Sequence, residues 1–228
     1  MTNRRTPVSY RDLNFRTIRE KRYAHLWLLL GWVGYFLLYA LTENLIPPEK
    51  CHVIHCALDD RIPFCEWFLI FYASWYVLIV LSLLYFLRWD VPSFKRLQVF
   101  IMITQAVAML VYILWPSRQD LRPEVFPRQN VLTWAMGVVY GFDTSTGVCP
   151  SLPVAYSIGI ASVWLRQREV RPLWRGLIAL LCAVICISTA FVKQHSVLDI
   201  LAALPLGLLA EILVYGRWWM ERLGKKKA

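Results

Sequence analysis

The sequence predicts an all-α fold: a polytopic membrane protein with six transmembrane helices in one bundle and both termini in the cytoplasm. Three observations predict it. Of the 228 residues, 58% are hydrophobic and only 18% are charged, whereas a soluble domain carries about 25% charged residues. The charged residues are bunched between long apolar runs. The Lys and Arg residues, in turn, gather on alternate connections between those runs.

The apolar runs define the expected spans. A hydrocarbon core about 30 Å thick needs roughly 20 apolar residues per helix. Five runs meet that length, and a sixth run, at 150–165, is shorter but is still predicted to span. The run at 131–140 is too short to cross, and we interpret it as an interfacial or re-entrant segment. The five long runs lie at residues 25–42, 64–89, 94–115, 173–192 and 197–215.

The basic residues set the predicted orientation. With six spans and an internal N-terminus, the cytoplasmic segments hold 19 of the 25 Lys and Arg residues. This bias fits the positive-inside rule, and attraction to anionic lipid head groups explains much of the net charge of +10. The chain therefore reads as one membrane domain, 25–216, between a basic cytoplasmic N-terminal segment, 1–24, and a basic cytoplasmic tail, 217–228. Nucleic-acid binding is not expected.

A histidine and a carboxylate mark the first candidate for chemistry. His195 and Asp199 lie four residues apart at the outer end of an apolar run, so on a helix they share one face. Asp199 would then fix the imidazole tautomer and leave the other ring nitrogen free as a nucleophile. Lys193, two residues earlier, could neutralise an anion. The alternative is a purely structural His–Asp pair at the membrane interface.

Two further external segments, both within 116–199, fit an anion site. Pro150 and Ser151 open a predicted helix, whose free backbone N–H groups and positive dipole end suit a phosphate. Arg118 and Arg122 supply guanidinium forks of the kind that bind phosphate oxygens. Taken singly, Pro150 and Ser151 could form an ordinary helix cap, and the two arginines could be solvated loop charges. Together they favour a phosphate held at the bilayer surface, on a phospholipid or an isoprenoid.

These motifs resemble the type-2 phosphatidic acid phosphatase superfamily, in the branch that includes inositol-phosphorylceramide-synthase-like proteins. Arg122-Pro123 matches its first motif, Pro150-Ser151 part of its second, and His195 with Asp199 its third. The resemblance implies a six-helix bundle and a metal-free reaction through a phosphohistidine on His195, oriented by Asp199. It also implies that Arg118, Arg122, Ser151 and Lys193 bind the phosphoryl oxygens.

The sequence departs from this family pattern at three positions. Trp115 and Thr189 stand where the family has a lysine and an arginine, and Pro153 replaces the second-motif histidine that protonates the leaving group. General acid catalysis contributes about 10²- to 10⁴-fold, so the loss favours a lipid diphosphate, whose leaving group needs little protonation. His52 or His55 could supply the missing acid if the first external loop folds over the site.

The leading hypothesis is therefore a lipid phosphatase or phosphotransferase of the plasma membrane, with its site facing outside. The second is a non-catalytic scaffold that binds lipid phosphates and has lost the acid. A transporter is a weaker third reading because, among the acidic residues of the runs, only Glu211 lies deep in one. The expected partners are the lipid substrate and the surrounding lipids, no cofactor is expected, and the oligomeric state stays open.

Overall fold

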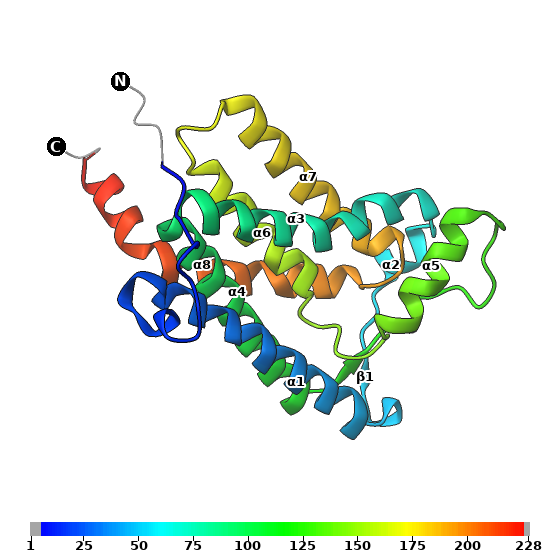
Figure 1. Cartoon of the computed structure of the whole chain (residues 1–228). Coiled ribbons are helices and arrows are strands. Elements are labelled where there is room, and N and C mark those ends of the chain that lie inside the picture. Colours follow the sequence, from blue (N-terminus) through cyan, green and yellow to red (C-terminus); the bar gives the residue numbers. More distant parts are fainter. Residues whose placement is uncertain (1–5, 226–228) are drawn as a thin grey trace.

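The chain is almost wholly helical (Figure 1). The computed structural model describes residues 6–225, with the side chains of residues 6–217; residues 1–5 and 226–228 of the two predicted basic segments lie outside the described residues. The elements are η1 Thr17–Arg19, η2 Lys21–Leu29, α1 Leu30–Leu45, η3 Pro48–Lys50, β1 His52–Val53, α2 Ala57–Arg61, η4 Glu66–Phe68, α3 Leu69–Trp89, α4 Val91–Leu114, β2 Ser117–Arg118, α5 Val131–Phe142, α6 Leu152–Leu165, α7 Pro172–Phe191 and α8 Val197–Lys225.

The predicted all-α class is confirmed, and five helical stretches of the described chain are long and apolar enough to cross a membrane. They are Lys21–Leu45, Glu66–Trp89, Val91–Leu114, Pro172–Phe191 and Val197–Arg217. The expected sixth span, α6, has only 14 residues. At 1.5 Å per residue it is about 21 Å long, short of a hydrocarbon core about 30 Å thick. A six-span topology therefore stays a prediction.

The short helix α6 is the centre of the bundle. Most of its residues are buried, and it packs against α3, α4, α7 and α8. Small residues allow this close packing, as in other membrane helices. A Cβ atom added at Gly159 would lie 2.6 Å from the Phe100 ring, and one at Gly207 would lie 2.7 Å from Ile158. Helix α6 is therefore held inside a ring of longer helices, several of which expose apolar side chains outward.

The two ends of the described chain lie at one end of the bundle, and α2 and α5 lie at the other (Figure 1). The N-terminal segment is fixed there because the Val8 amide donates to the Arg88 carbonyl, at 2.9 Å. Helix α8 continues to Lys225, so the first part of the predicted tail, 217–225, is helical. Which end faces the cytoplasm remains a prediction from the Lys and Arg distribution.

The loops at the α2 and α5 end are joined to one another. Strands β1 and β2 pair in parallel, with His52 opposite Ser117 and Val53 opposite Arg118. The buried Glu66 carboxylate also accepts hydrogen bonds from Arg128, at 2.8 Å, and from Asn130, at 3.1 Å. These contacts anchor the long loop before α5 to the start of α3. They give the site a rigid frame.

Candidate functional site

The turn between α7 and α8 carries the predicted nucleophile. Helix α7 ends at Phe191, and Lys193 adopts a left-handed conformation with φ of 54°. This conformation is common just past a helix end, where it reverses the chain. The amides of Gln194 and His195 both donate to the Thr189 carbonyl, at 3.0 and 3.2 Å. The turn therefore places His195 directly before α8.

The His195 and Asp199 side chains are in contact. Nδ1 of His195 lies 3.3 Å from Oδ2 of Asp199, which also accepts the Ser196 amide at 2.9 Å. Asp199 is fully buried, and His195 is 8% exposed. Among the described residues, no side chain or backbone group bonds Nε2 of His195. The arrangement leaves that nitrogen available to a ligand.

Asp59, on α2, is a site residue that sequence reasoning missed. Its Oδ2 accepts the Ser196 hydroxyl at 2.6 Å and the Cys56 amide at 2.8 Å, and its Oδ1 accepts the Val197 amide at 2.8 Å. Burial raises the pKa of Asp59, but these hydrogen bonds lower it more, so the net shift is downward. Asp59 thus caps α8 from a distant loop. No local signal links positions so far apart in sequence.

Lys193 points away from the histidine. Its Nζ donates to the carbonyls of Asp59, at 2.8 Å, and Ile62, at 2.5 Å. Burial lowers the pKa of this amine. The lysine joins the turn to α2 and does not line the cavity next to His195. A phosphate contact from Lys193 would require it to leave both carbonyls.

The two arginines differ in their surroundings. Arg118 pairs with Asp120 at 3.2 Å on a half-exposed surface. Arg122 is enclosed: it donates to the carbonyls of Tyr140, at 3.1 Å, and Asp143, at 2.5 Å, and to Oε1 of Gln194 at 2.6 Å. Burial lowers its pKa, but a guanidinium keeps its charge at neutral pH. Arg122 is therefore a partly buried cation bonded to Gln194, and it does not line the cavity next to His195.

Ser151 lies behind the histidine. Its amide donates to the Asp199 carbonyl at 3.1 Å, and its hydroxyl is buried without a hydrogen-bond partner among the described residues. The neighbouring Cys149 thiol lies against Asp199, and burial together with that carboxylate raises the pKa of Cys149 to about 12. Ser151 thus supports the position of Asp199. Its hydroxyl is fully buried, and Ser151 does not line the cavity next to His195.

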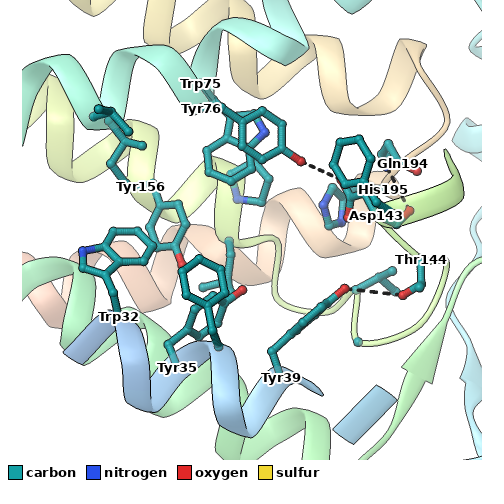
Figure 2. A pocket seen from close by; sticks show the side chains of 18 of the residues that line it. Trp32, Tyr35, Tyr39, Trp75, Tyr76, Asp143, Thr144, Tyr156, Gln194 and His195 are labelled. Carbon is teal, nitrogen blue, oxygen red and sulfur yellow. Dashed lines mark hydrogen bonds between the residues drawn. The ribbon is translucent and has the colours of Figure 1, made fainter. Parts of the chain in front are cut away.

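A cavity of about 570 Å³ opens beside His195. Aromatic side chains from α1, α3, α4, α5 and α6 line much of it, and Figure 2 shows Trp32 at one end and Gln194, His195 and Asp143 at the other. Pro153 lines it too. The aromatic residues are Trp32, Tyr35, Phe36, Tyr39, Trp75, Tyr76, Tyr112, Phe142 and Tyr156. The cavity therefore combines a long apolar part with a small polar end, as sites for amphiphilic ligands do.

Asp143 is a carboxylate at the polar end of the cavity, beside His195. It follows the last residue of α5. The Tyr72 hydroxyl donates to its Oδ2, and the Tyr76 hydroxyl lies 3.3 Å from the same oxygen. Among the described residues that line the cavity, Asp143 is the only carboxylate.

The two histidines proposed as substitutes for the missing acid lie elsewhere. His52 stacks on Trp115, with ring centroids 5.0 Å apart, and His55 pairs with Asp60 at 2.8 Å. Neither lines the cavity. The structure therefore gives the loop histidines no path to the His195 turn.

Among the described residues, no three His, Cys, Asp or Glu side chains come together in a way that could hold a metal ion. No protein-family model, curated protein or solved structure matches this chain.

Proposed function

We propose that this protein is a membrane lipid phosphatase or phosphotransferase that acts on a lipid phosphate or diphosphate through a phosphohistidine on His195. The observation that carries the proposal is the cavity: its apolar part suits a lipid chain, and its polar end brings that chain's head group to the free Nε2 of His195. An unpaired histidine nitrogen at the end of a lipid-sized cavity is well placed for phosphoryl transfer.

The reaction has two steps. Nε2 of His195 attacks phosphorus, the N–P bond forms, and the bond to the lipid oxygen breaks. Asp199 holds the ring through Nδ1 and stabilises the positive charge that develops on it. Water or another hydroxyl then attacks phosphorus and releases His195. Which acceptor reaches the site decides between hydrolysis and transfer.

The phosphoryl charge needs compensation. Arg122 supplies a partly buried positive charge bonded to Gln194, which lines the cavity. The Ser151 hydroxyl is buried outside the cavity and would have to become accessible before it could donate. Arg118 lies farther out, paired with Asp120, and Lys193 is held by two carbonyls. We propose Arg122 as the main electrostatic contributor, and Arg118 and Lys193 as groups that bind phosphate only after rearranging.

The proposed setting is the plasma membrane, with the site on the outer face and both termini in the cytoplasm. The uneven distribution of Lys and Arg supports this orientation. The motifs built on Arg122, Ser151, His195 and Asp199 support membership of the type-2 phosphatidic acid phosphatase superfamily. Because Pro153 cannot donate a proton, lipid diphosphates with good leaving groups are the proposed preferred substrates.

A second candidate is a non-catalytic binder of lipid phosphates. Pro153 favours it, since the residue lines the cavity where the family has its acid. The test is phosphate release by purified protein from an isoprenoid diphosphate and from phosphatidic acid, with His195→Ala and Pro153→His alongside. Activity that His195→Ala abolishes supports the enzyme. A folded wild type that binds lipid phosphate but releases none, while Pro153→His turns over, supports the binder.

A further inference from the structure

We propose that Asp143 is the proton-transfer group of this site and takes the part that Pro153 cannot play. The inference rests on the proposed function and deepens it. It starts from a juxtaposition: Asp143, Pro153 and His195 come from three separate segments and line the same cavity. A side chain that protonates a leaving group must lie within reach of the phosphorus that the nucleophile attacks.

The Asp143 carboxyl is held in a defined orientation. Both tyrosine contacts, from Tyr72 and Tyr76, go to Oδ2. Among the described residues, Oδ1 makes no hydrogen bond and is left for a ligand. The backbone carbonyl of Asp143 accepts Arg122 at 2.5 Å and Gln194 at 3.4 Å. Because Gln194 precedes His195, these contacts join the carboxyl to the nucleophile turn.

The other polar groups of the cavity are less suited to the task. The Tyr112 hydroxyl donates to the Pro150 carbonyl at 2.7 Å, and the Tyr39 hydroxyl contacts Thr144 at 3.5 Å. A tyrosine, with an ordinary pKa of about 10, is a weaker acid than a carboxyl. His195 itself is the nucleophile. Asp143 is the only carboxyl among the described residues that line the cavity.

The proton enters with the substrate. A phosphate monoester carries one proton in its monoanion form, and a hydrogen bond from that proton to Oδ1 of Asp143 transfers it to the carboxyl. The carboxyl then passes this proton to the leaving oxygen.

The proposed step balances as follows. As the His195 Nε2–P bond forms, the P–O bond to the lipid breaks, and the leaving oxygen takes the proton from Oδ1 of Asp143. In the second step the Asp143 carboxylate takes the proton of the attacking water or hydroxyl while the N–P bond breaks. The carboxyl and the imidazole both return to their starting states.

The consequence concerns substrate class. A site with its own acid is not restricted to diphosphates, and phosphate monoesters with alkoxide leaving groups become substrates. The proton donor should matter most for those esters and little for a leaving group that is stable as an anion. This difference separates an acid role from a merely structural one.

The experiment compares dodecyl phosphate, which leaves as an alkoxide, with 4-nitrophenyl phosphate, which leaves as a stable phenolate. Asp143→Asn should lower kcat about 100-fold or more for dodecyl phosphate and leave 4-nitrophenyl phosphate turnover nearly unchanged. Glu124→Gln, an exposed carboxyl on the loop before α5, is the control and should turn over both. Tyr72→Phe, which removes the shorter of the two hydrogen bonds to Oδ2, should give an intermediate loss on dodecyl phosphate alone.

The outcomes separate the two proposals. If Asp143→Asn slows both substrates equally, or neither, while wild type is active and His195→Ala is inactive, the acid assignment is overturned and the proposed function stands. If folded wild type turns over neither ester but releases phosphate from an isoprenoid diphosphate, the acid assignment fails and the proposed function stands. If it releases phosphate from none of the three, both proposals fail. Selective loss on dodecyl phosphate supports both.

Discussion

Asp59 and Val197 are 138 residues apart in sequence, yet Oδ1 of Asp59 accepts the Val197 amide at 2.8 Å. The first amides of a helix have no partner within the helix, and a carboxylate there also interacts favourably with the helix dipole. The same carboxylate accepts the Ser196 hydroxyl at 2.6 Å. The position of His195 thus depends on a residue of the separate helix α2.

Replacing Asp59 should loosen the His195 turn. Asp59→Asn keeps the size of the side chain but loses its charge and part of its acceptor capacity, and hydrogen bonds to charged groups contribute about 1.5–3 kcal/mol each. We expect a lower thermal midpoint in detergent and weaker phosphate release. Asp60→Asn, on the same short helix but exposed, is the control and should keep the wild-type midpoint. Equal midpoints for Asp59→Asn and wild type would contradict the capping role.

Acid should weaken the same contact. The folded-state pKa of Asp59 lies below the ordinary value of 3.8, so its contribution to stability is complete above that value and is lost as pH falls through the lower folded-state pKa. The thermal midpoint of wild type should therefore fall when the pH is lowered below about 4. Asp59→Asn should drop less over the same range, because it lacks the titrating group. Parallel pH profiles for the two proteins would be inconsistent with this linkage.

The apolar part of the cavity should select for long chains. Val80, on α3, lines the cavity and is 53% exposed. Val80→Trp fills part of the cavity and leaves less room for the lipid chain. KM for dodecyl phosphate should therefore rise about tenfold, which corresponds to the loss of roughly 1.4 kcal/mol of apolar contact. KM for 4-nitrophenyl phosphate should change little. Val77→Trp, at an exposed position of α3 outside the cavity, is the control, and an equal effect from it would count against a chain-binding role.

Close packing around α6 should tolerate no added methyl group. At Gly159 the new Cβ would lie 2.6 Å from the Phe100 ring, and overpacking of this kind costs about 1–3 kcal/mol. Gly159→Ala should therefore lower the thermal midpoint. Gly34→Ala, on α1, has no atom within 4 Å of its added Cβ and should match or exceed wild type, because glycine is unfavourable inside a helix. Similar thermal midpoints for the two variants would show that the helices around α6 shift to accommodate the added methyl group, which would contradict the prediction.

Hydropathy was sufficient to predict the class of fold and the approximate helix positions. Hydropathy did not fix the exact helix lengths. The run at 150–165, close to the minimum length for a membrane span, forms α6 of only 14 residues. The first apolar helical stretch begins at Lys21, ahead of the expected residue 25. In α6 the apolar residues face other helices on nearly every side. An apolar run buried in protein and one facing lipid have the same composition.

The sequence by itself determined what depends on neighbours along the chain: the helical class, with long apolar helices, and the short separation of His195 and Asp199. The two side chains meet although His195 lies in the turn before α8 and not on the helix, as the four-residue spacing had suggested. Only the tertiary structure decided which distant groups meet. It turned Lys193 toward Asp59 and Ile62, joined Arg122 to Gln194, stacked His52 on Trp115, and placed Asp143 in the cavity of His195. The physical reason is that loops at one end of a bundle compete for the same buried hydrogen-bonding groups. Which donor pairs with which acceptor depends on how the helices pack, so it cannot be predicted from a local sequence pattern.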